Sequence, residues 1–382
     1  MDSHTLVDAA MSFGTPLYVY DLPFVLQRIS VVTELFKDFD FHLAFAVKAN
    51  FNKDILSALE KSGAMVDVVS FGEYNQVRSV GFTPDRIIVN GNCKKKEELD
   101  KYVQDGVFSI NLDSYEELLR LETVLSRPAR VSIRVNPDVD AKTHRHIATG
   151  LRENKFGVDF DTASAMIERI RSNKMLELIG LHCHIGSQIT EVEPYLEAVV
   201  SIKYFARSVG LRVQVFNLGG GWGIDYGNGK SLDLEEYRQK IFPILKEFGS
   251  AIVLELGRWI VAPSAYLVSK VEYVKKTASK IFVMLDTGMT HLIRPALYGA
   301  KHKIIPLYET KGRKKIKADV VGPICESADT FRKSYTMAEP KEGEFVAICD
   351  VGAYGYAMAS DYNLIPKPKE VIWDGKKLFR SS

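Results

Sequence analysis

The chain has 382 residues, with 50 Lys or Arg against 48 Asp or Glu, a formal net charge of +2 and a hydrophobic fraction of 46%. This balance excludes the strongly basic composition typical of nucleic-acid-binding proteins, and no apolar run approaches the roughly 20 residues that a membrane span requires. The length exceeds one ordinary domain, so we expect two domains, or one barrel with an appendage, acting on a small molecule.

In the first two thirds of the chain, apolar runs alternate with segments whose apolar residues recur three and four apart. The apolar runs cover 41–47, 65–70, 86–91, 107–113, 130–137, 178–186, 213–221 and 251–257. The helix-patterned segments include 53–62, 95–104, 114–125, 162–172, 193–208 and 234–247. Near-continuous apolar runs are typical of strands buried on both faces, and their alternation with helices indicates a parallel sheet. Eight such units predict an α/β fold with a (β/α)8 TIM-like barrel, and an open doubly wound sheet is the alternative.

After Glu255 the helical pattern nearly vanishes, and strand-like runs follow one another through turn residues. These runs cover 264–276, 280–286, 318–325 and 344–352. The N-terminal segment 15–21 is also strand-like, and we expect it to pair with this mostly β, Greek-key or β-barrel-like region. The predicted domains are therefore a barrel over 24–257 and a β domain formed by 1–23 together with 258–382.

Polar residues collect at the carboxyl ends of the predicted barrel strands, where the active sites of such barrels lie. They are Lys48, Asp67, Ser70, Asn90, Arg134, Asn136, His184, Ser187, the loop 219–223 and Glu255. The loop, GGGWG, follows the seventh strand, where barrels commonly bind phosphate through exposed backbone N–H groups. Glycine-rich turns are common, so its position rather than its composition favours a phosphate site.

Lys48 ends the run FHLAFAVKAN, and a lysine at the mouth of a barrel can be desolvated enough to form a Schiff base with a carbonyl group. The alternative is a lysine whose stem lines the rim and whose ammonium reaches solvent. Glu255 is either an acid that contacts a cofactor or an ion-pair partner of Arg258, and His184 either stacks on a ring or fills the core. A lysine, a phosphate loop and a carboxylate on one rim match the requirements of pyridoxal phosphate.

Several motifs occur in order along the chain, namely AVKAN, HCHIGSQ, LGGGWGIDYG, ELGR, DTGMTHLIRPALYGA, GPICESAD and GAYGYAMASDYN. Through them the chain resembles the alanine racemase-like, fold-type III pyridoxal phosphate decarboxylases over essentially its whole length, and within that family it looks like the diaminopimelate decarboxylases. The resemblance implies a barrel, a C-terminal β domain and a head-to-tail homodimer whose active sites are shared between subunits. It also implies decarboxylation of meso-2,6-diaminopimelate to L-lysine, the last step of lysine biosynthesis, with pyridoxal 5'-phosphate as cofactor.

The resemblance also assigns roles to individual residues, matched motif by motif. The catalytic residues that it implies are Lys48, His184, Glu255 and Cys325. Lys48 would form the Schiff base, His184 would stack on the cofactor ring, and Glu255 would contact the pyridine nitrogen. The implied cofactor contacts are Lys48, Asp67, His184, Ser187, Gly219, Gly220, Gly221, Glu255, Leu256, Gly257, Arg258 and Tyr354. The implied substrate contacts are Arg258, Arg294, Tyr298, Glu326 and Tyr354, and no metal is implied.

The end of the substrate that does not react decides between related enzymes. Arg294 and Arg258 supply bidentate donors for a retained carboxylate, whereas an ornithine decarboxylase meets a bare ammonium there. The family assigns Cys325, the proton donor, and Glu326 to the other subunit, and ornithine decarboxylases typically show Cys-Asp at this pair. The alternative is another basic amino-acid or a carboxynorspermidine-type decarboxylase. The four cysteines form no CxxC pair and no secretory leader is recognisable, so we expect a cytoplasmic protein.

Some positions depart from the family's usual pattern. Leu256 stands in place of a proline, Phe71 in place of a glycine, and His291 in place of an aspartate. Leu256 bears on how rigidly Glu255 is presented, and His291 bears on specificity near the distal end of the substrate. Lys155 is the rival Schiff-base lysine, and its loop position predicts weaker desolvation than at Lys48. It ends the segment 138–155, which is a candidate for closing over the site.

Overall fold

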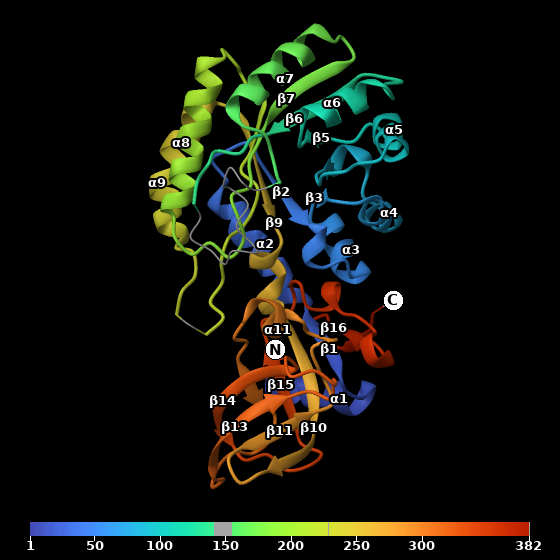
Figure 1. Ribbon diagram of the computed structural model, residues 1–382, viewed down its shortest axis with the longest axis vertical. Helices are drawn as coiled ribbons and strands as arrows, with labels where there is room; N and C mark the ends of the chain where they lie inside the picture. The colour runs from blue at the N-terminus through green and yellow to red at the C-terminus, as the bar shows by residue number, and fades with distance from the viewer. Residues whose placement is uncertain (141–154, 228, 382) are drawn as a thin grey trace. The chain divides into compact units, whose positions relative to one another are not determined.

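A computed structural model describes residues 1–140, 155–227 and 229–381 (Figure 1). The chain forms two compact units. The barrel unit comprises Arg28–Ile224 and Ser231–Trp259, and the β unit comprises Met1–Gln27, Asp225–Lys230 and Ile260–Ser382. The short segment Asp225–Lys230 thus groups with the two chain ends, although barrel elements flank it in the sequence.

Within the described residues of the barrel unit, eight strands close into a parallel barrel. They are β2 (Phe41–Ala46), β3 (Met65–Val68), β4 (Ile87–Val89), β5 (Ser109–Leu112), β6 (Ala129–Arg134), β7 (Leu176–His182), β8 (Val215–Asn217) and β9 (Ala251–Leu256). β9 closes the barrel by pairing with β2, where Ile252 lies opposite Phe41. The predicted barrel is confirmed, and the open sheet is wrong. β8 is shorter than its predicted run, 213–221, because the glycines at the end of that run leave the sheet as a loop.

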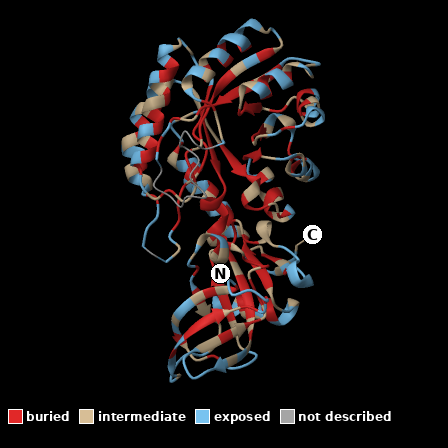
Figure 2. Cartoon of the chain, in the orientation of Figure 1, coloured by how far each residue is buried: buried red, intermediate tan, exposed pale blue. Residues whose placement is uncertain are grey.

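The helices of the barrel unit follow the strands in alternation. They are α2 (Leu22–Leu35, which begins in the β unit), α3 (Lys53–Lys61), α4 (Phe71–Ser79), α5 (Lys96–Asp105), α6 (Tyr115–Glu122), α7 (Phe160–Ser172), α8 (Glu193–Ser208) and α9 (Leu234–Phe248). The barrel strands are buried along most of their length, whereas the outer faces of the helices are exposed (Figure 2). The segments named from the sequence pattern include neither α2 nor α4, and α4 buries only Tyr74 and Val77.

The interior of the barrel has an apolar floor. It is made by the buried side chains of Ala44, Met65, Ile88, Ile179, Val215 and Val253. Because side chains alternate between the two faces of a strand, the next residue to point inward lies two positions further along. That position carries a polar group on several strands, so the chemistry of the interior changes sharply from one layer to the next.

In the described residues, the β unit contains a nine-stranded sheet in which β1 lies between β10 and β16. Its elements are α1 (Ser3–Phe13), β1 (Leu17–Asp21), α10 (Arg258–Val261, which begins in the barrel unit), β10 (Ala265–Lys276), β11 (Ile281–Leu285), α11 (Arg294–Tyr298), β12 (Ile304–Pro306), β13 (Lys315–Val321), β14 (Thr330–Ala338), β15 (Phe345–Cys349), β16 (Lys369–Trp373) and β17 (Leu378–Arg380). β1 pairs antiparallel with β10 and parallel with β16, so the predicted pairing of the N-terminal strand with this region is confirmed. Leu6 and Ala10 of α1 pack on this sheet through a cluster that includes Leu17.

Across the described residues, none of the helices combines the length and apolar character needed to cross a membrane.

Gly180 in β7 lies opposite Val215 of β8, and a Cβ atom added to it would come within 2.2 Å of the Val215 carbonyl oxygen. We expect Gly180→Ala to lower the free energy of unfolding by about 1–3 kcal/mol, because the two strands would have to move apart. Gly72→Ala is the control, because the nearest atom to its added carbon would be Ser70 Oγ, at the ordinary contact distance of 3.7 Å. Gly72 lies in helix α4, where alanine is favoured over glycine, so this substitution should leave stability unchanged or slightly higher. Urea unfolding measures both changes. A Gly180→Ala protein as stable as the wild type would contradict this close approach.

Candidate active site

A layer of polar side chains lies directly above the apolar floor, toward the carboxyl ends of the strands. Asp67, Asn90, Asn217 and Glu255 each lie two residues beyond a floor residue of the same chain segment, and each is buried. Polar groups sealed inside a barrel are costly unless they are hydrogen-bonded to one another or to a ligand. This layer is therefore the candidate active site of the barrel unit.

Glu255 has hydrogen-bond partners for both of its carboxylate oxygens. Its Oε1 accepts hydrogen bonds from the amide groups of Asn90 and Asn217, both at 2.7 Å, and its Oε2 lies 3.1 Å from Nε2 of His182. Burial raises the pKa of this carboxyl, but His182, Lys48 and the Asn217 amide outweigh burial and hold the pKa below its usual value. Glu255 is therefore an ionised acceptor inside the barrel. Among the described residues, the hydrogen bonds of Glu255 go to Asn90, Asn217 and His182 and not to Arg258, the ion-pair partner that the sequence offered as the alternative.

Asp67 behaves in the opposite way. Burial, reinforced by the charge of Glu255 and only partly offset by Lys48, raises the pKa of Asp67 to about 7. Its Oδ1 accepts from the Asn90 amide at 2.7 Å, whereas its Oδ2 is buried, has no hydrogen-bond partner among the described residues and lies 3.8 Å from Nζ of Lys48. Carboxyl groups whose pKa values are pushed apart in this way commonly hold different protonation states at neutral pH.

Lys48 lies in the turn η1 (Val47–Ala49) that follows β2. Its side chain is 39% exposed, so the amine combines a buried acidic neighbour with access from outside the barrel. The turn is held from the side by Gly257, where an added Cβ would stand only 2.7 Å from that of Ala49. The rival, Lys155, is exposed and places its ammonium 5.1 Å from the Phe156 ring centroid, which is a surface arrangement.

His184 and the glycine loop meet at the end of β8. The backbone N–H of Gly220 donates to Nδ1 of His184 at 3.1 Å, so that nitrogen is an acceptor. Burial, then the nearby charges of Lys48 and Arg134, lowers the pKa of His184 well below its ordinary value. His184 is therefore a neutral, flat ring at neutral pH, suited to stack on an aromatic cofactor.

Three positions in the loop can only be glycine, and the first is Gly219, at φ +63°, where a Cβ would lie 2.4 Å from the Cys183 carbonyl oxygen. A Cβ on Gly220 would lie 2.0 Å from the Glu255 carbonyl oxygen, and one on Gly221, at φ +95°, would lie 2.4 Å from that of Gly186. Close backbone approach of this kind is what loops that hold phosphate groups require. Beside the loop, Arg258 donates from Nη2 to Ser187 Oγ at 2.9 Å, which places a cation and a hydroxyl next to each other.

The barrel residues fit pyridoxal phosphate. They supply a lysine reachable from outside, an ionised carboxylate, a neutral ring, a glycine cradle and an Asp67 oxygen that accepts no hydrogen bond from the described residues. Of the sequence-predicted residues, the barrel unit contains Lys48, Asp67, His184, Ser187, Gly219, Gly220, Gly221, Glu255, Leu256, Gly257 and Arg258.

The remaining predicted residues lie in the β unit. Arg294 and Tyr298 begin and end α11, and Tyr354 follows β15 with φ +57°. Cys325 and Glu326 are exposed in the loop after β13. This loop has defined geometry, because the Cys325 N–H donates to Asn363 Oδ1 at 3.3 Å and Glu326 accepts from the Tyr362 hydroxyl at 3.0 Å.

The three departures from the family pattern all have structural explanations. Leu256 ends β9 fully buried and lies opposite Phe45, while Phe71 stacks on Tyr74 in α4. His291 is buried, with its Nδ1 3.0 Å from the Thr287 hydroxyl and its Nε2 3.1 Å from the Pro366 carbonyl oxygen. Both of its nitrogens are thus engaged within the β unit. Most of the candidate closing segment, residues 141–154, lies outside the described residues.

Sequence reasoning missed the residues that hold the carboxylates. His182 and Asn217 contact Glu255, and the Asn111 amide donates to Asn90 at 2.8 Å, fixing the orientation of that amide. The available signal was the two-residue step from the floor, which places Asn217 after Val215. It was obscured because the run around Asn217 also reads as the start of the glycine loop.

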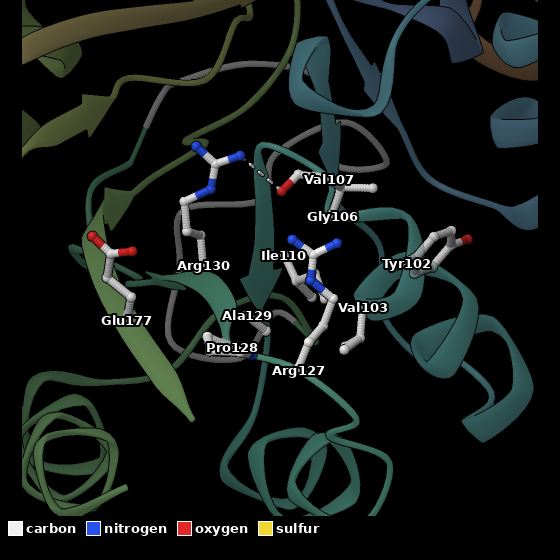
Figure 3. A pocket seen from close by; sticks show the side chains of 10 residues that line it. All are labelled: Tyr102, Val103, Gly106, Val107, Ile110, Arg127, Pro128, Ala129, Arg130 and Glu177. Carbon is white, nitrogen blue, oxygen red and sulfur yellow. Dashed lines mark hydrogen bonds between the residues drawn. The ribbon is translucent and has the colours of Figure 1, made fainter. Parts of the chain in front are cut away.

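A cavity of about 230 Å³ lies at the amino-terminal ends of the strands, opposite the polar layer (Figure 3). Its charged lining residues are Arg127, Arg130 and Glu177, near the starts of β6 and β7. Arg127 and Arg130 donate to the carbonyl oxygens of Gln104 and Val107 at 3.2 and 3.3 Å. The amino-terminal face of such barrels supports stability rather than catalysis, so we assign these contacts to the fold.

Comparison with known proteins gives consistent matches. Residues 25–262 match the family described as pyridoxal-dependent decarboxylase, pyridoxal binding domain. The chain is 41% identical over 378 residues to the diaminopimelate decarboxylase of Aquifex aeolicus, across 96% of this chain and 89% of that protein. The crystal structure of diaminopimelate decarboxylase from Helicobacter pylori complexed with L-lysine has a TM-score of 0.94 at 38% identity, covering 99% and 97% of the two chains. The Methanocaldococcus jannaschii enzyme in co-complex with L-lysine has a TM-score of 0.92 at 34% identity, covering 98% and 91%.

The raised pKa of Asp67 predicts a stability that depends on pH. Because the folded value, about 7, exceeds the ordinary 3.8, the folded chain retains a proton that the unfolded chain has lost, and stability falls as pH rises between these values. In the cofactor-free protein, Asp67→Asn should remove this loss, so its free energy of unfolding relative to the wild type should rise by up to about 4 kcal/mol across that range. Urea unfolding at several pH values measures the difference, with Asp161→Asn, at an exposed position of α7, as the control. A difference that does not change with pH would contradict the prediction.

Proposed function

The chain belongs to the pyridoxal-dependent decarboxylase family, and we propose that it is a diaminopimelate decarboxylase, which converts meso-2,6-diaminopimelate to L-lysine and carbon dioxide. The observation that carries this proposal is the similarity, over nearly the whole chain, to diaminopimelate decarboxylases whose crystal structures hold L-lysine. The reaction would be the last step of lysine biosynthesis. Pyridoxal 5'-phosphate is the cofactor.

In this proposal the barrel unit holds the cofactor. Lys48 would hold the cofactor through its aldehyde, and the loop 219–221, with Ser187 and Arg258 beside it, would hold the phosphate. Glu255 would contact the pyridine nitrogen, where an ionised carboxylate favours a proton. When bound, pyridoxal phosphate supplies an electron sink for the bond that breaks at the substrate Cα. His184 would stack on the ring as a neutral group, and Asp67, Leu256, Gly257 and Tyr354 would make further contacts.

The proton that replaces carbon dioxide would come from Cys325. Its loop is exposed on the described chain, and Glu326 next to it is exposed as well. A proton donor must be close to the reacting carbon, so an exposed loop suits a residue that completes the site of another subunit. We therefore propose a homodimer in which each subunit supplies Cys325 and Glu326 to its partner.

The substrate carries an amino-acid group at each end, and the end that does not react keeps its carboxylate. We assign Arg258, Arg294, Tyr298 and Tyr354 to this end, with Arg294 as the main cation because a guanidinium binds a carboxylate through two parallel hydrogen bonds. The cysteines are free thiols in the described chain, which is compatible with the cytoplasmic location that we propose.

Release of carbon dioxide and L-lysine from meso-2,6-diaminopimelate, by purified protein loaded with pyridoxal phosphate, tests the function. We expect turnover of diaminopimelate and little or none of lysine, ornithine, arginine or carboxynorspermidine, because only diaminopimelate presents a retained carboxylate at the right distance. Preferred turnover of ornithine or carboxynorspermidine would keep the barrel site but overturn the assignment of the distal end.

Mixing two inactive variants tests the shared site. Lys48→Ala and Cys325→Ala should each lack activity, because one loses the covalent attachment of the cofactor and the other the proton donor. If subunits exchange, an equal mixture should regain about a quarter of the wild-type activity, since half of the dimers then hold one intact site. Activity of the mixture no higher than that of its components, after confirmed exchange, would show that Cys325 acts within its own subunit. Borohydride trapping of cofactor on Lys48→Ala would contradict the role of Lys48.

A further inference from the structure

The cation assigned to the retained carboxylate is held by a histidine. Nη1 of Arg294 lies 2.9 Å from Nε2 of His302, and the two side chains are almost fully buried. The ring of Tyr226 completes the arrangement, with its centroid 4.7 Å from the guanidinium carbon and 5.1 Å from the His302 ring centroid. These residues lie together in the β unit.

The contacts of His302 define its protonation state. A guanidinium nitrogen only donates hydrogen bonds, so Nε2 of His302 must be the acceptor. Its Nδ1 lies 2.8 Å from the carbonyl oxygen of Cys349, which only accepts, so Nδ1 carries the proton. His302 is therefore the neutral tautomer, and its own carbonyl oxygen accepts from Arg332 Nη1 at 3.0 Å. The ring cannot rotate or protonate without losing one of these bonds.

His302 and the Tyr226 ring orient the guanidinium of Arg294 and add no negative charge of their own. A guanidinium whose orientation is fixed in a buried setting is suited to a ligand carboxylate, because little rotamer entropy is then lost on binding.

We propose that His302 is a positioning residue for Arg294, and that it sets the preference for substrates and products that retain a distal carboxylate. This inference rests on the proposed function, because it takes Arg294 as the group that binds this carboxylate. His302 itself does not touch the ligand.

Two substitutions separate the two bonds of His302. The side-chain amide of His302→Asn reaches the position of Nδ1 and can still donate to Cys349, but it leaves Arg294 Nη1 without this acceptor. The longer His302→Gln places an oxygen near the position of Nε2 and can still accept from Arg294. Both variants lose one hydrogen bond, so thermal unfolding provides a matched comparison of their structural cost.

We would titrate L-lysine, which keeps the carboxylate, and cadaverine, which lacks it, into the holoenzymes by calorimetry, and measure kcat and KM for diaminopimelate. We expect His302→Asn to weaken L-lysine binding and raise KM by roughly 10-fold or more, while cadaverine binding and the affinity for pyridoxal phosphate stay within about twofold. His302→Gln should restore most of the L-lysine affinity, and Arg294→Leu should remove the preference for L-lysine over cadaverine.

The outcomes separate the inference from the function beneath it. If the wild type does not turn over diaminopimelate, the proposed function fails. If it does, but His302→Asn keeps the preference of the wild type for L-lysine, or His302→Gln loses it to the same extent as His302→Asn, the positioning role of His302 is overturned. An Arg294→Leu enzyme that retains the preference would overturn it as well, because His302 would then have no cation to act through.

Discussion

A carboxylate removed from water is the group on which the interior of this barrel depends. Burying the charge of Glu255 costs several kcal/mol unless its oxygens receive hydrogen bonds, and the donors Asn90, Asn217 and His182 provide them. Each donor belongs to a different strand segment, so the carboxylate is satisfied only when the barrel is closed. The closed fold therefore creates the ionised acceptor, and the same network leaves Asp67 as the neighbour that retains a proton.

The alternation of side chains along the strands explains why the sequence predicts so much of this site. Lys48, Glu255 and the loop 219–221 follow long apolar runs, and the carboxyl ends of those runs must meet at one end of a barrel. His182 and Asn217 were hidden for the same reason, because each lies inside a run that already accounts for the fold. Which of these buried groups face each other is decided by barrel closure, which brings together residues such as Asn90 and Glu255, 165 positions apart in the sequence.

The β unit was harder to predict than the barrel. β14 is partly exposed along its length, so it lacks the continuous apolar run that marks the barrel strands. The apolar residues of α1 are explained only by the sheet on which they pack. The role of His302 could not be predicted for another reason, because a single histidine after α11 belongs to no recognisable sequence pattern. Its role depends on the guanidinium of Arg294 and the carbonyl group of Cys349, which contact its two ring nitrogens. These two groups are 55 residues apart in the sequence, and only the folded β unit brings both of them to His302.

The position of β1 in the sheet also constrains how the chain is made. β1 pairs with β10 and β16, whose residues are translated only after every strand of the barrel. At translation rates of roughly 5–20 residues per second, the amino-terminal strand waits on the order of tens of seconds for its second neighbour. Until β10 is made, both edges of β1 expose unpaired N–H and C=O groups, and the edge that pairs with β16 remains exposed until β16 is made; such edges can pair with strands of other nascent chains. The order of synthesis therefore exposes β1 to pairing with other chains during translation, and β10 and β16 are the strands that end this exposure.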